Sequence, residues 1–267
     1  MIDDYVHGYA ERESVRLSDQ AGTLAELLHG DTRYPDGSTV LEAGCGVGAQ
    51  SLLLARNSPG ARFTCIDVSP ASLDQARDRA RAAGIDNASF EQADLRELPF
   101  PPDTFDHVFV CFVLEHLSNP LGALASMKSC LRRGGTITVI EGDHGSTLFH
   151  PENADARRAT ACLVEIQADS GGDALIGRRL HPLLSRAGFD LVAVSPRVAY
   201  ADASRPAWVE GFTKNTFIAM VEGVRDEVVR RGLMPPAAWR AGIDGLHRTT
   251  EPDGVFCYTF FKAVGVK

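Results

Sequence analysis

The sequence lacks the long apolar run that a membrane-spanning helix requires. No stretch of 18 consecutive apolar residues occurs in its 267 residues. The first residues, MIDDYVHGYAERES, are acidic and polar, whereas a secretory signal peptide begins with basic and then apolar residues. We therefore expect a cytoplasmic protein without membrane insertion.

Clusters of basic side chains are also scarce. Lys and Arg number 27 against 35 Asp and Glu, so the formal net charge is -8 at pH 7. Proteins that bind nucleic acids draw affinity from grouped Lys and Arg side chains that neutralise phosphates. We expect a small-molecule partner and no nucleic acid. The composition is compatible with an oligomer but does not predict one.

The six cysteines form no metal-binding or disulfide pattern. They lie at positions 45, 65, 111, 130, 162 and 257, mostly in apolar segments, and no two are spaced as Cys-x-x-Cys. A disulfide framework is typical of small secreted domains, and a structural zinc site requires paired ligands. We predict buried free thiols and no metal site.

Short apolar runs alternate with helical patterns in the first half of the chain. The apolar runs lie at 39–43, 61–68, 88–93, 105–113 and 136–142. Such alternation predicts a parallel sheet covered by helices on both faces, with ligands bound beyond the carboxyl ends of the strands. We expect a single α/β domain over residues 1–267.

The last third of the chain departs from this alternation. Further strands are expected at 189–200 and 255–266, and mainly helical segments at 152–187 and 206–248. We assign residues 144–175 and 201–250 to helical insertions that cap a substrate. In the second insertion a possible apolar helical stripe is formed by Trp208, Phe212, Phe217, Met220 and Val221. Its side chains are expected to pack the core or to line a partly apolar pocket.

Residues 1–30 are predicted to be an N-terminal helical lid. The segment 14–29 has helical spacing and is followed by Gly30, which is typical of a helix end. Ahead of it lie the rings of Tyr5, His7 and Tyr9. We expect this segment either to cover a bound cofactor, with Tyr5 in contact, or to fix the N-terminus to the core.

The stretch VLEAGCGVG at 40–48 joins the first predicted strand to a helix. Glycine lets a backbone approach a ligand closely because it has no Cβ and tolerates positive φ. Gly44, Gly46 and Ala49 also satisfy the loose GxGxxG/A pattern of dinucleotide-binding proteins, and Asp67 lies at a suitable distance for a ribose contact. The glycines alone therefore do not exclude an NAD-type oxidoreductase.

Three carboxylates at successive strand ends favour a cationic nucleoside. Glu42 stands near the end of the first strand, where it would attract a positively charged methionine moiety and repel a pyrophosphate. Asp67 ends the second strand and can accept from both ribose hydroxyls. Asp94 follows the third strand and can accept from an adenine amine, with Leu95 beside the ring. Taken singly, each acid could instead be a helix cap, a turn cap or a surface acid.

Four segments in this order resemble the class I S-adenosylmethionine-dependent methyltransferase superfamily. They are VLEAGCGVG, the strand that ends at Asp67, ADLRELPFPPDTFDHVFVCFVLEHL at 93–117 and LRRGGTITVIEGD at 131–143. The resemblance is to the branch of Methyltransf_11 and Methyltransf_25-like domains, which includes quinone-biosynthesis methyltransferases. It implies a Rossmann-like seven-stranded sheet in the order 3-2-1-4-5-7-6, with strand 7 antiparallel and formed by VFCYTFFKAVGV.

The resemblance also implies S-adenosylmethionine as cofactor and S-adenosylhomocysteine as product. Cys111 would face the methionine moiety through its backbone, and His116 would lie near the sulfonium. Glu115 and His116 could instead be a polar start of the next helix. The predicted cofactor site comprises Tyr5, Glu42, Gly44, Cys45, Gly46, Asp67, Val68, Asp94, Leu95, Cys111 and His116.

The implied reaction is in-line transfer of a methyl group to a small-molecule acceptor. A hydroxyl acceptor of high pKa would need a base, and Asp143 and His144, which follow the fifth predicted strand, are the candidate catalytic residues. Their alternative role is to cap the next helix from a loop. A descendant that binds the cofactor but transfers no methyl group, or catalyses another reaction, also stays open. The sequence does not predict which atom accepts the methyl group.

Overall fold

The computed structural model describes residues 22–267. Within this range seven strands form one sheet in the order β3-β2-β1-β4-β5-β7-β6, which confirms the predicted order. The pairs from β3 to β5 are parallel, whereas β7 is antiparallel to both β5 and β6. The protein therefore has the predicted Rossmann-like sheet with a reversed last strand.

The strands are β1 (Thr39–Ala43), β2 (Arg62–Asp67), β3 (Ala88–Gln92), β4 (Phe105–Cys111), β5 (Leu131–His150), β6 (Asp190–Ala201) and β7 (Val255–Val266). The helices are a segment at 22–29, α2 (Ala49–Asn57), α3 (Pro70–Ala82), η1 (Leu114–His116), α4 (Pro120–Cys130), α5 (Ala154–Asp169), η2 (Ile176–Arg179), α6 (Leu180–Arg186), α7 (Pro206–Trp208), η3 (Val209–Ile218), α8 (Ala219–Gly223), α9 (Arg225–Arg231) and α10 (Pro236–Arg248). Local capping starts several of them. Ser69 accepts a hydrogen bond from the third residue of α3, and Asn153 does the same for α5.

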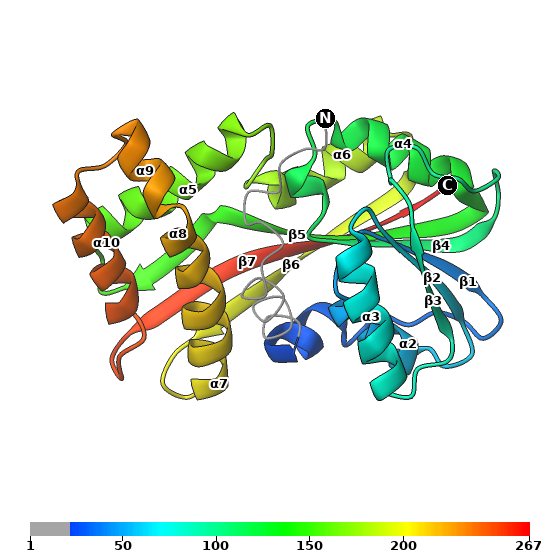
Figure 1. The fold of residues 1–267 in the computed structure, drawn as a ribbon, viewed down its shortest axis with the longest axis horizontal. Helices are drawn as coiled ribbons and strands as arrows, with labels where there is room; N and C mark the ends of the chain where they lie inside the picture. Colours follow the sequence, from blue (N-terminus) through cyan, green and yellow to red (C-terminus); the bar gives the residue numbers. More distant parts are fainter. Residues whose placement is uncertain (1–21) are drawn as a thin grey trace.

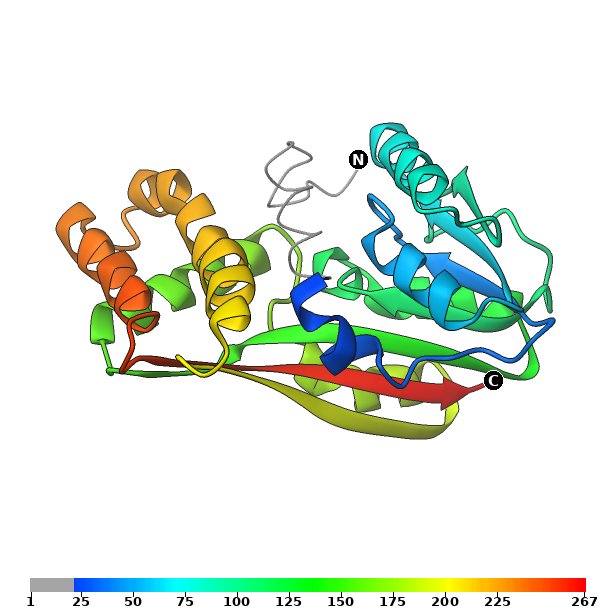
Figure 2. The same cartoon turned by 90° about the horizontal axis from the view of Figure 1, so that it is seen from below.

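Apolar side chains cover both faces of the sheet (Figures 1 and 2). One buried cluster joins the 22–29 helix, α2 and α3 to α5 and the helices α8 to α10. The other lies under α4, η2 and α6 on the opposite face. Strand β4 contributes to both clusters because successive side chains point to opposite faces. Phe109 lies in the first cluster and Val110 in the second, and both are fully buried. This burial on two faces explains why its sequence is almost continuously apolar.

Strands β5 and β7 are longer than the strands β1 to β4. They continue beyond these strands, and the cap helices α5 and α7 to α10 gather at their far end (Figure 1). The prediction that the fifth strand ends near residue 142 is therefore wrong, because β5 reaches His150 after an irregularity between Asp143 and Leu148. Pairing with β7 on both sides of this irregularity supplies the backbone hydrogen bonds that keep the strand extended.

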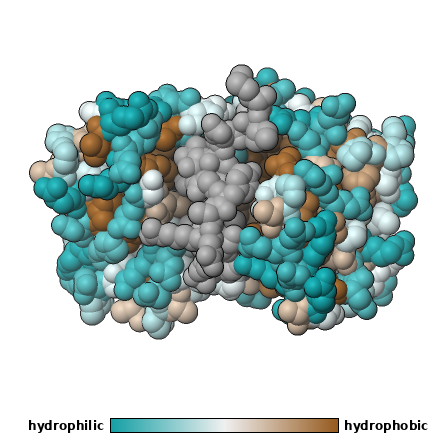
Figure 3. All heavy atoms as spheres, in the orientation of Figure 1, coloured by the Kyte–Doolittle hydropathy of each residue, from teal (hydrophilic) through white to brown (hydrophobic). Residues whose placement is uncertain are grey.

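An aromatic cluster fixes the cap to the sheet. The rings of Phe212 and Phe217 contact Tyr258 with centroid distances of 5.6 and 5.8 Å, and Phe217 also packs against Phe256 at 4.7 Å. In the space-filling view, apolar residues show between the cap helices, whereas polar residues cover most of the outer surface (Figure 3).

The five-residue step between Phe212 and Phe217 does not match an α-helical period. The segment η3 is a π-helix, in which residue i aligns with residue i+5, so both rings point to the same face. The Thr216 hydroxyl also donates to the Gly211 carbonyl oxygen, five residues earlier. The predicted apolar stripe is thus continuous only because the helix changes its hydrogen-bonding period.

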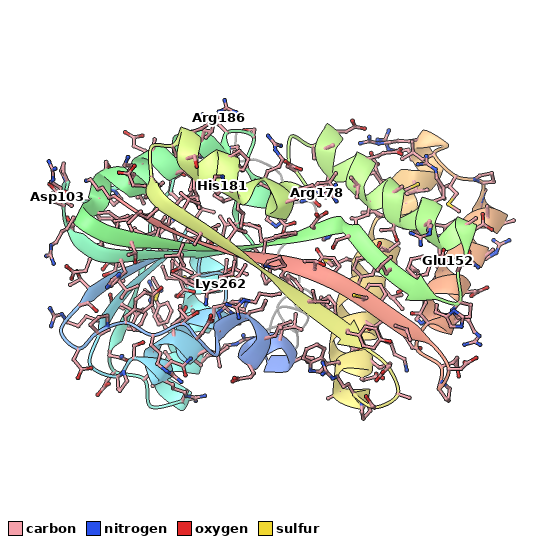
Figure 4. The ribbon with its side chains drawn as sticks, turned by 180° about the vertical axis from the view of Figure 1, so that it is seen from behind. Asp103, Glu152, Arg178, His181, Arg186 and Lys262 are labelled. Carbon is pink, nitrogen blue, oxygen red and sulfur yellow. The ribbon has the colours of Figure 1, made fainter. Side chains whose placement is uncertain are left out.

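A buried lysine connects β7 to the segment between the 22–29 helix and β1. Lys262 Nζ donates to Asp31 Oδ1 and to Thr32 Oγ1, both at 2.6 Å. Figure 4 shows Lys262 on the side of the 22–29 helix and Arg178 on the side of η2 and α6. In residues 22–267 no helix has both the length and the apolarity needed to cross a membrane.

We predict that Phe217→Ala lowers the free energy of unfolding by about 3 to 5 kcal/mol, because it empties a fully buried position between the cap and β7. Urea unfolding followed by circular dichroism measures the change. Val229→Ala, at an exposed position of α9, is the control and should change stability by less than about 0.5 kcal/mol. Equal effects of the two substitutions would contradict this role of the aromatic cluster.

Candidate functional site

The turn between β1 and α2 adopts backbone conformations that glycine allows and other residues rarely adopt. Gly44, Gly46 and Gly48 have φ values of 77°, 51° and 77°. A Cβ at Gly44 would lie 2.5 Å from a Val113 methyl carbon. At Gly46, by contrast, a Cβ would meet no atom within 4 Å in the described part of the chain. The turn therefore packs against Val113 at Gly44 and leaves its backbone uncovered at Gly46.

Asp67 holds this turn from the end of β2. Its Oδ2 accepts from the Gly46 N–H and its Oδ1 from the Ser69 N–H, both at 2.9 Å. Burial raises the pKa of this carboxyl group above its usual range. A carboxylate offers about four lone-pair positions, so both oxygens can still accept from a ligand's hydroxyls.

Glu42 lies beneath the turn with 3% of its surface exposed. Its Oε2 makes no hydrogen bond within residues 22–267. Burial, together with the nearby charge of Asp67, raises the pKa of Glu42 to about 7. An unsatisfied buried acid is costly, and a cationic ligand group at this position would relieve that cost.

Asp94 follows β3 and is held in a bidentate ion pair. Arg96 Nη2 donates to its Oδ2 at 2.7 Å, and Arg96 Nε donates to both oxygens at 3.0 Å. This side-chain hydrogen bond lowers the pKa of Asp94. Leu95 beside it is buried. A purine amine at Asp94 would therefore have to share the carboxylate with a guanidinium.

The other predicted cofactor residues lie around the same edge of the sheet. Cys45 is in the glycine turn, Val68 follows β2 and is 36% exposed, and Cys111 ends β4. Burial raises the pKa of both thiols, so neither is an activated thiolate. All six cysteines are free, with Cys111 and Cys257 only partly buried. The predicted Tyr5 contact lies outside the described residues.

The turn after β4 carries His116 and is held from two sides. Glu141 Oε1 accepts from the Val113 and Leu114 N–H groups at 3.0 and 2.7 Å. On the other side, Gln167 of α5 donates to the Glu115 carbonyl oxygen at 3.2 Å. His116 Nε2 lies 3.6 Å from Glu115 Oε1. The sequence pattern did not mark Glu141, which directly follows the run TVI.

Asp143 and His144 lie within β5 and not in a loop after it, and both are buried. Arg178 of η2 donates to both Asp143 oxygens at 2.6 and 2.7 Å. His144 Nδ1 lies 2.7 Å from the Tyr258 hydroxyl oxygen. The structure thus gives each residue a partner from a distant segment. No sequence signal marked Arg178 or Tyr258 for these contacts.

The group that best fits this edge of the sheet is cationic and bears hydroxyls. Glu42, Asp67 and the open face of Gly46 come together where β1 and β2 end, whereas Asp143 and His144 lie along β5. Within residues 22–267 no set of three His, Cys, Asp or Glu side chains is placed to hold a metal ion.

Comparison with known proteins agrees with this geometry. Residues 40–135 match the family described as methyltransferase domain. The rifamycin-modifying 27-O-demethylrifamycin SV methyltransferase of Amycolatopsis mediterranei is 31% identical over 157 residues, which is 57% of this chain and 56% of that protein. Methyltransferase GfsG of Streptomyces halstedii is 34% identical over 53% of this chain and 52% of its own length. Residues 40–135 are therefore similar to the methyltransferase domain family.

The methyltransferase fold extends over nearly the whole chain. YcgJ of Bacillus subtilis superposes with a TM-score of 0.58 at 16% identity and covers 92% of this chain and 98% of its own. The (4+2)-cyclase SpnF superposes with a TM-score of 0.56 at 20% identity, covering 93% of this chain and 81% of its own. The chain spans a little more than half the length of the two curated methyltransferases. These likenesses establish the fold but leave the acceptor open.

We predict that Glu42→Gln stabilises this methyltransferase-fold protein increasingly as pH rises from 5 to 8. The pKa of Glu42 is raised from 4.5 to about 7 by burial, so the folded wild type binds the proton more tightly than the unfolded chain. Its stability should therefore fall between these two pKa values and level off above 7. The difference from Glu42→Gln should reach at most about 3 kcal/mol at pH 8.

Urea unfolding without ligand at pH 5, 6, 7 and 8 measures this difference. Glu97→Gln replaces an exposed glutamate and serves as the control, with no expected change in the pH profile. Parallel pH profiles for wild type and Glu42→Gln would show that Glu42 ionises normally.

Proposed function

We propose that this chain is an S-adenosylmethionine-dependent methyltransferase that acts on a small-molecule acceptor. The observation that carries the proposal is the buried Glu42, whose Oε2 is unsatisfied in the described residues, beneath a glycine turn that exposes backbone at Gly46. A cofactor with a positively charged amino-acid end and a ribose fits this arrangement. A pyrophosphate would be repelled by Glu42.

Each part of the cofactor has a residue of suitable chemistry. Glu42 would attract the α-ammonium group, and Asp67 would accept from the ribose hydroxyls while it keeps the Gly46 N–H. Asp94 and Leu95 would flank the adenine. Cys111 and His116 would border the methionine end. When bound, the cofactor supplies a methyl group on a positively charged sulfur.

The substrate side of the site is proposed to include Asp143 and His144. Asp143 is paired with Arg178, which makes it a fixed element of the wall. His144 is the better candidate base. Its 2.7 Å contact with the Tyr258 hydroxyl can form in either imidazole tautomer, because the hydroxyl can donate or accept. His144 can therefore take an acceptor's proton at Nε2 while Nδ1–H donates to Tyr258.

The chain's own contribution to the reaction is alignment and exclusion of water. In-line displacement needs the acceptor atom, the methyl carbon and the sulfur in one line. The aromatic cap over β7 would exclude water from this line. The rifamycin-modifying relative supports a small organic molecule as acceptor.

Calorimetry with S-adenosylmethionine, S-adenosylhomocysteine and NAD tests the cofactor. We expect the first two to bind and NAD to give no heat. Asp67→Asn should weaken S-adenosylhomocysteine binding by about tenfold or more, because charge-assisted hydrogen bonds to the ribose are lost. Asp74→Asn, on the exposed face of α3, is the control and should bind normally. Tight NAD binding without a response to S-adenosylmethionine would contradict the proposal.

Turnover tests the role of His144. The protein is screened against a small-molecule library with isotope-labelled methyl donor, and the best acceptor is used for the variants. His144→Ala should lower turnover by about 100-fold, as expected for loss of a general base, with S-adenosylhomocysteine affinity unchanged. His181→Ala, at an exposed position of α6, should have no effect.

Unchanged turnover in His144→Ala would remove this residue from the mechanism. Cofactor binding without labelling of any acceptor would instead favour a binding protein or another reaction.

A further inference from the structure

Glu141 of β5 lies against the turn that follows β4. It is fully buried in β5, and its Oε1 accepts the Val113 and Leu114 N–H groups at 3.0 and 2.7 Å. These N–H groups belong to the turn between β4 and η1, where no strand or helix partner is available to them. Glu141 therefore satisfies two donors that would otherwise be buried without acceptors.

The turn that Glu141 holds is strained and packs against the glycine turn. Phe112 has φ 57°, a conformation that non-glycine residues rarely adopt. The Val113 methyl groups lie where a Cβ of Gly44 would be. A shift of Val113 would therefore change the wall beside Gly44, which is the end of the site near Glu42.

The same turn is also hydrogen-bonded to α5 and to the segment that follows it. Gln167 of α5 donates to the Glu115 carbonyl oxygen at 3.2 Å and to Glu115 Oε2 at 3.3 Å. The Asp173 N–H donates to the Glu115 carbonyl oxygen at 2.8 Å. The cap thus holds the end of the turn, whereas β5 holds its beginning, through Glu141 at Val113 and Leu114 and through the Ile140 carbonyl oxygen, which accepts the Phe112 N–H at 2.9 Å.

We propose that Glu141 is a positioning residue that seats the 112–116 turn against Gly44 by accepting two backbone N–H groups, and so shapes the site for the methionine end of the cofactor. Its hydrogen-bond acceptor matters and its charge does not. This inference rests on the proposed function only for the identity of the ligand. The seating itself is a property of the protein without ligand.

Burial supports a neutral acceptor. Burial, followed by the charge of Glu115, raises the pKa of Glu141 well above its usual range. The carbonyl oxygen of a protonated carboxyl group still has two lone pairs for the two N–H groups. A glutamine has the same acceptor oxygen on a side chain of the same length, so Glu141→Gln should replace it, whereas Glu141→Leu should not.

Hydrogen exchange tests the seating directly. In the protein without ligand, the Val113 and Leu114 amides should be protected in wild type and in Glu141→Gln. In Glu141→Leu they should exchange about tenfold faster or more, while the β4 amides keep their protection. Glu91→Leu makes the same chemical change at an exposed position of β3 and should leave both groups of amides unchanged.

Ligand affinity tests the consequence for the site. Glu141→Leu should bind S-adenosylhomocysteine about tenfold more weakly or worse, but should bind 5′-methylthioadenosine, which lacks the amino-acid end, within about twofold of wild type. Glu141→Gln should bind S-adenosylmethionine and S-adenosylhomocysteine within about twofold of wild type. If Glu141→Leu does not fold, Glu141→Gln alone decides.

The outcomes separate this inference from the proposed function. A selective loss of S-adenosylmethionine over S-adenosylhomocysteine in Glu141→Gln would show a role for charge and overturn the inference. Unchanged amide protection in a folded Glu141→Leu would also overturn it. A wild type that binds neither ligand would refute the proposed function, and the exchange measurement would still test the seating.

Discussion

Carboxylates that accept backbone N–H groups hold the functional edge of the sheet together. Asp67 fixes the glycine turn through the Gly46 N–H, and Glu141 fixes the next turn through the Val113 and Leu114 N–H groups. Asp143 accepts the Gly145 N–H at 3.0 Å, where β5 becomes irregular. At each point the backbone leaves regular pairing, and a buried side chain replaces the missing partner. The irregular backbone around the site depends on these three side-chain acceptors.

The long strands β5 and β7 place the cap relative to this edge. Tyr258 of β7 contacts both the cap ring Phe217 and the ring of His144 in β5. One buried cluster continues from the helices beside the glycine turn to the cap helices. The cap is therefore part of the same core as the cofactor half and not a separately folded unit. Changes in its packing are expected to reach His144 through a single layer of rings.

The fold and the glycine turn were predictable because local signals determine them. Alternating apolar runs gave six of the strands within one or two residues, and Ser69 marked the start of α3. The length of β5 was not predictable, because its polar residues after Glu141 belong to a strand that pairs with the distant β7 on both sides of an irregularity. The partners Arg178 and Tyr258 come from segments 35 and 114 residues away from Asp143 and His144. Such contacts arise from tertiary packing, which a single sequence does not encode as a local pattern.

The π-helical segment η3 has a consequence for how the length of this chain can vary. It aligns Phe212 with Phe217 across five residues, whereas an α-helix would align residues four apart. A related protein with one residue fewer between the two aromatic positions would present the same pair of rings from an ordinary α-helix. Loss of one residue here is therefore nearly silent for the aromatic pair and for the helix that follows, and it redirects only the side chains between the two rings. The cap can in this way change the residues it directs toward a substrate while its anchor to the sheet is conserved.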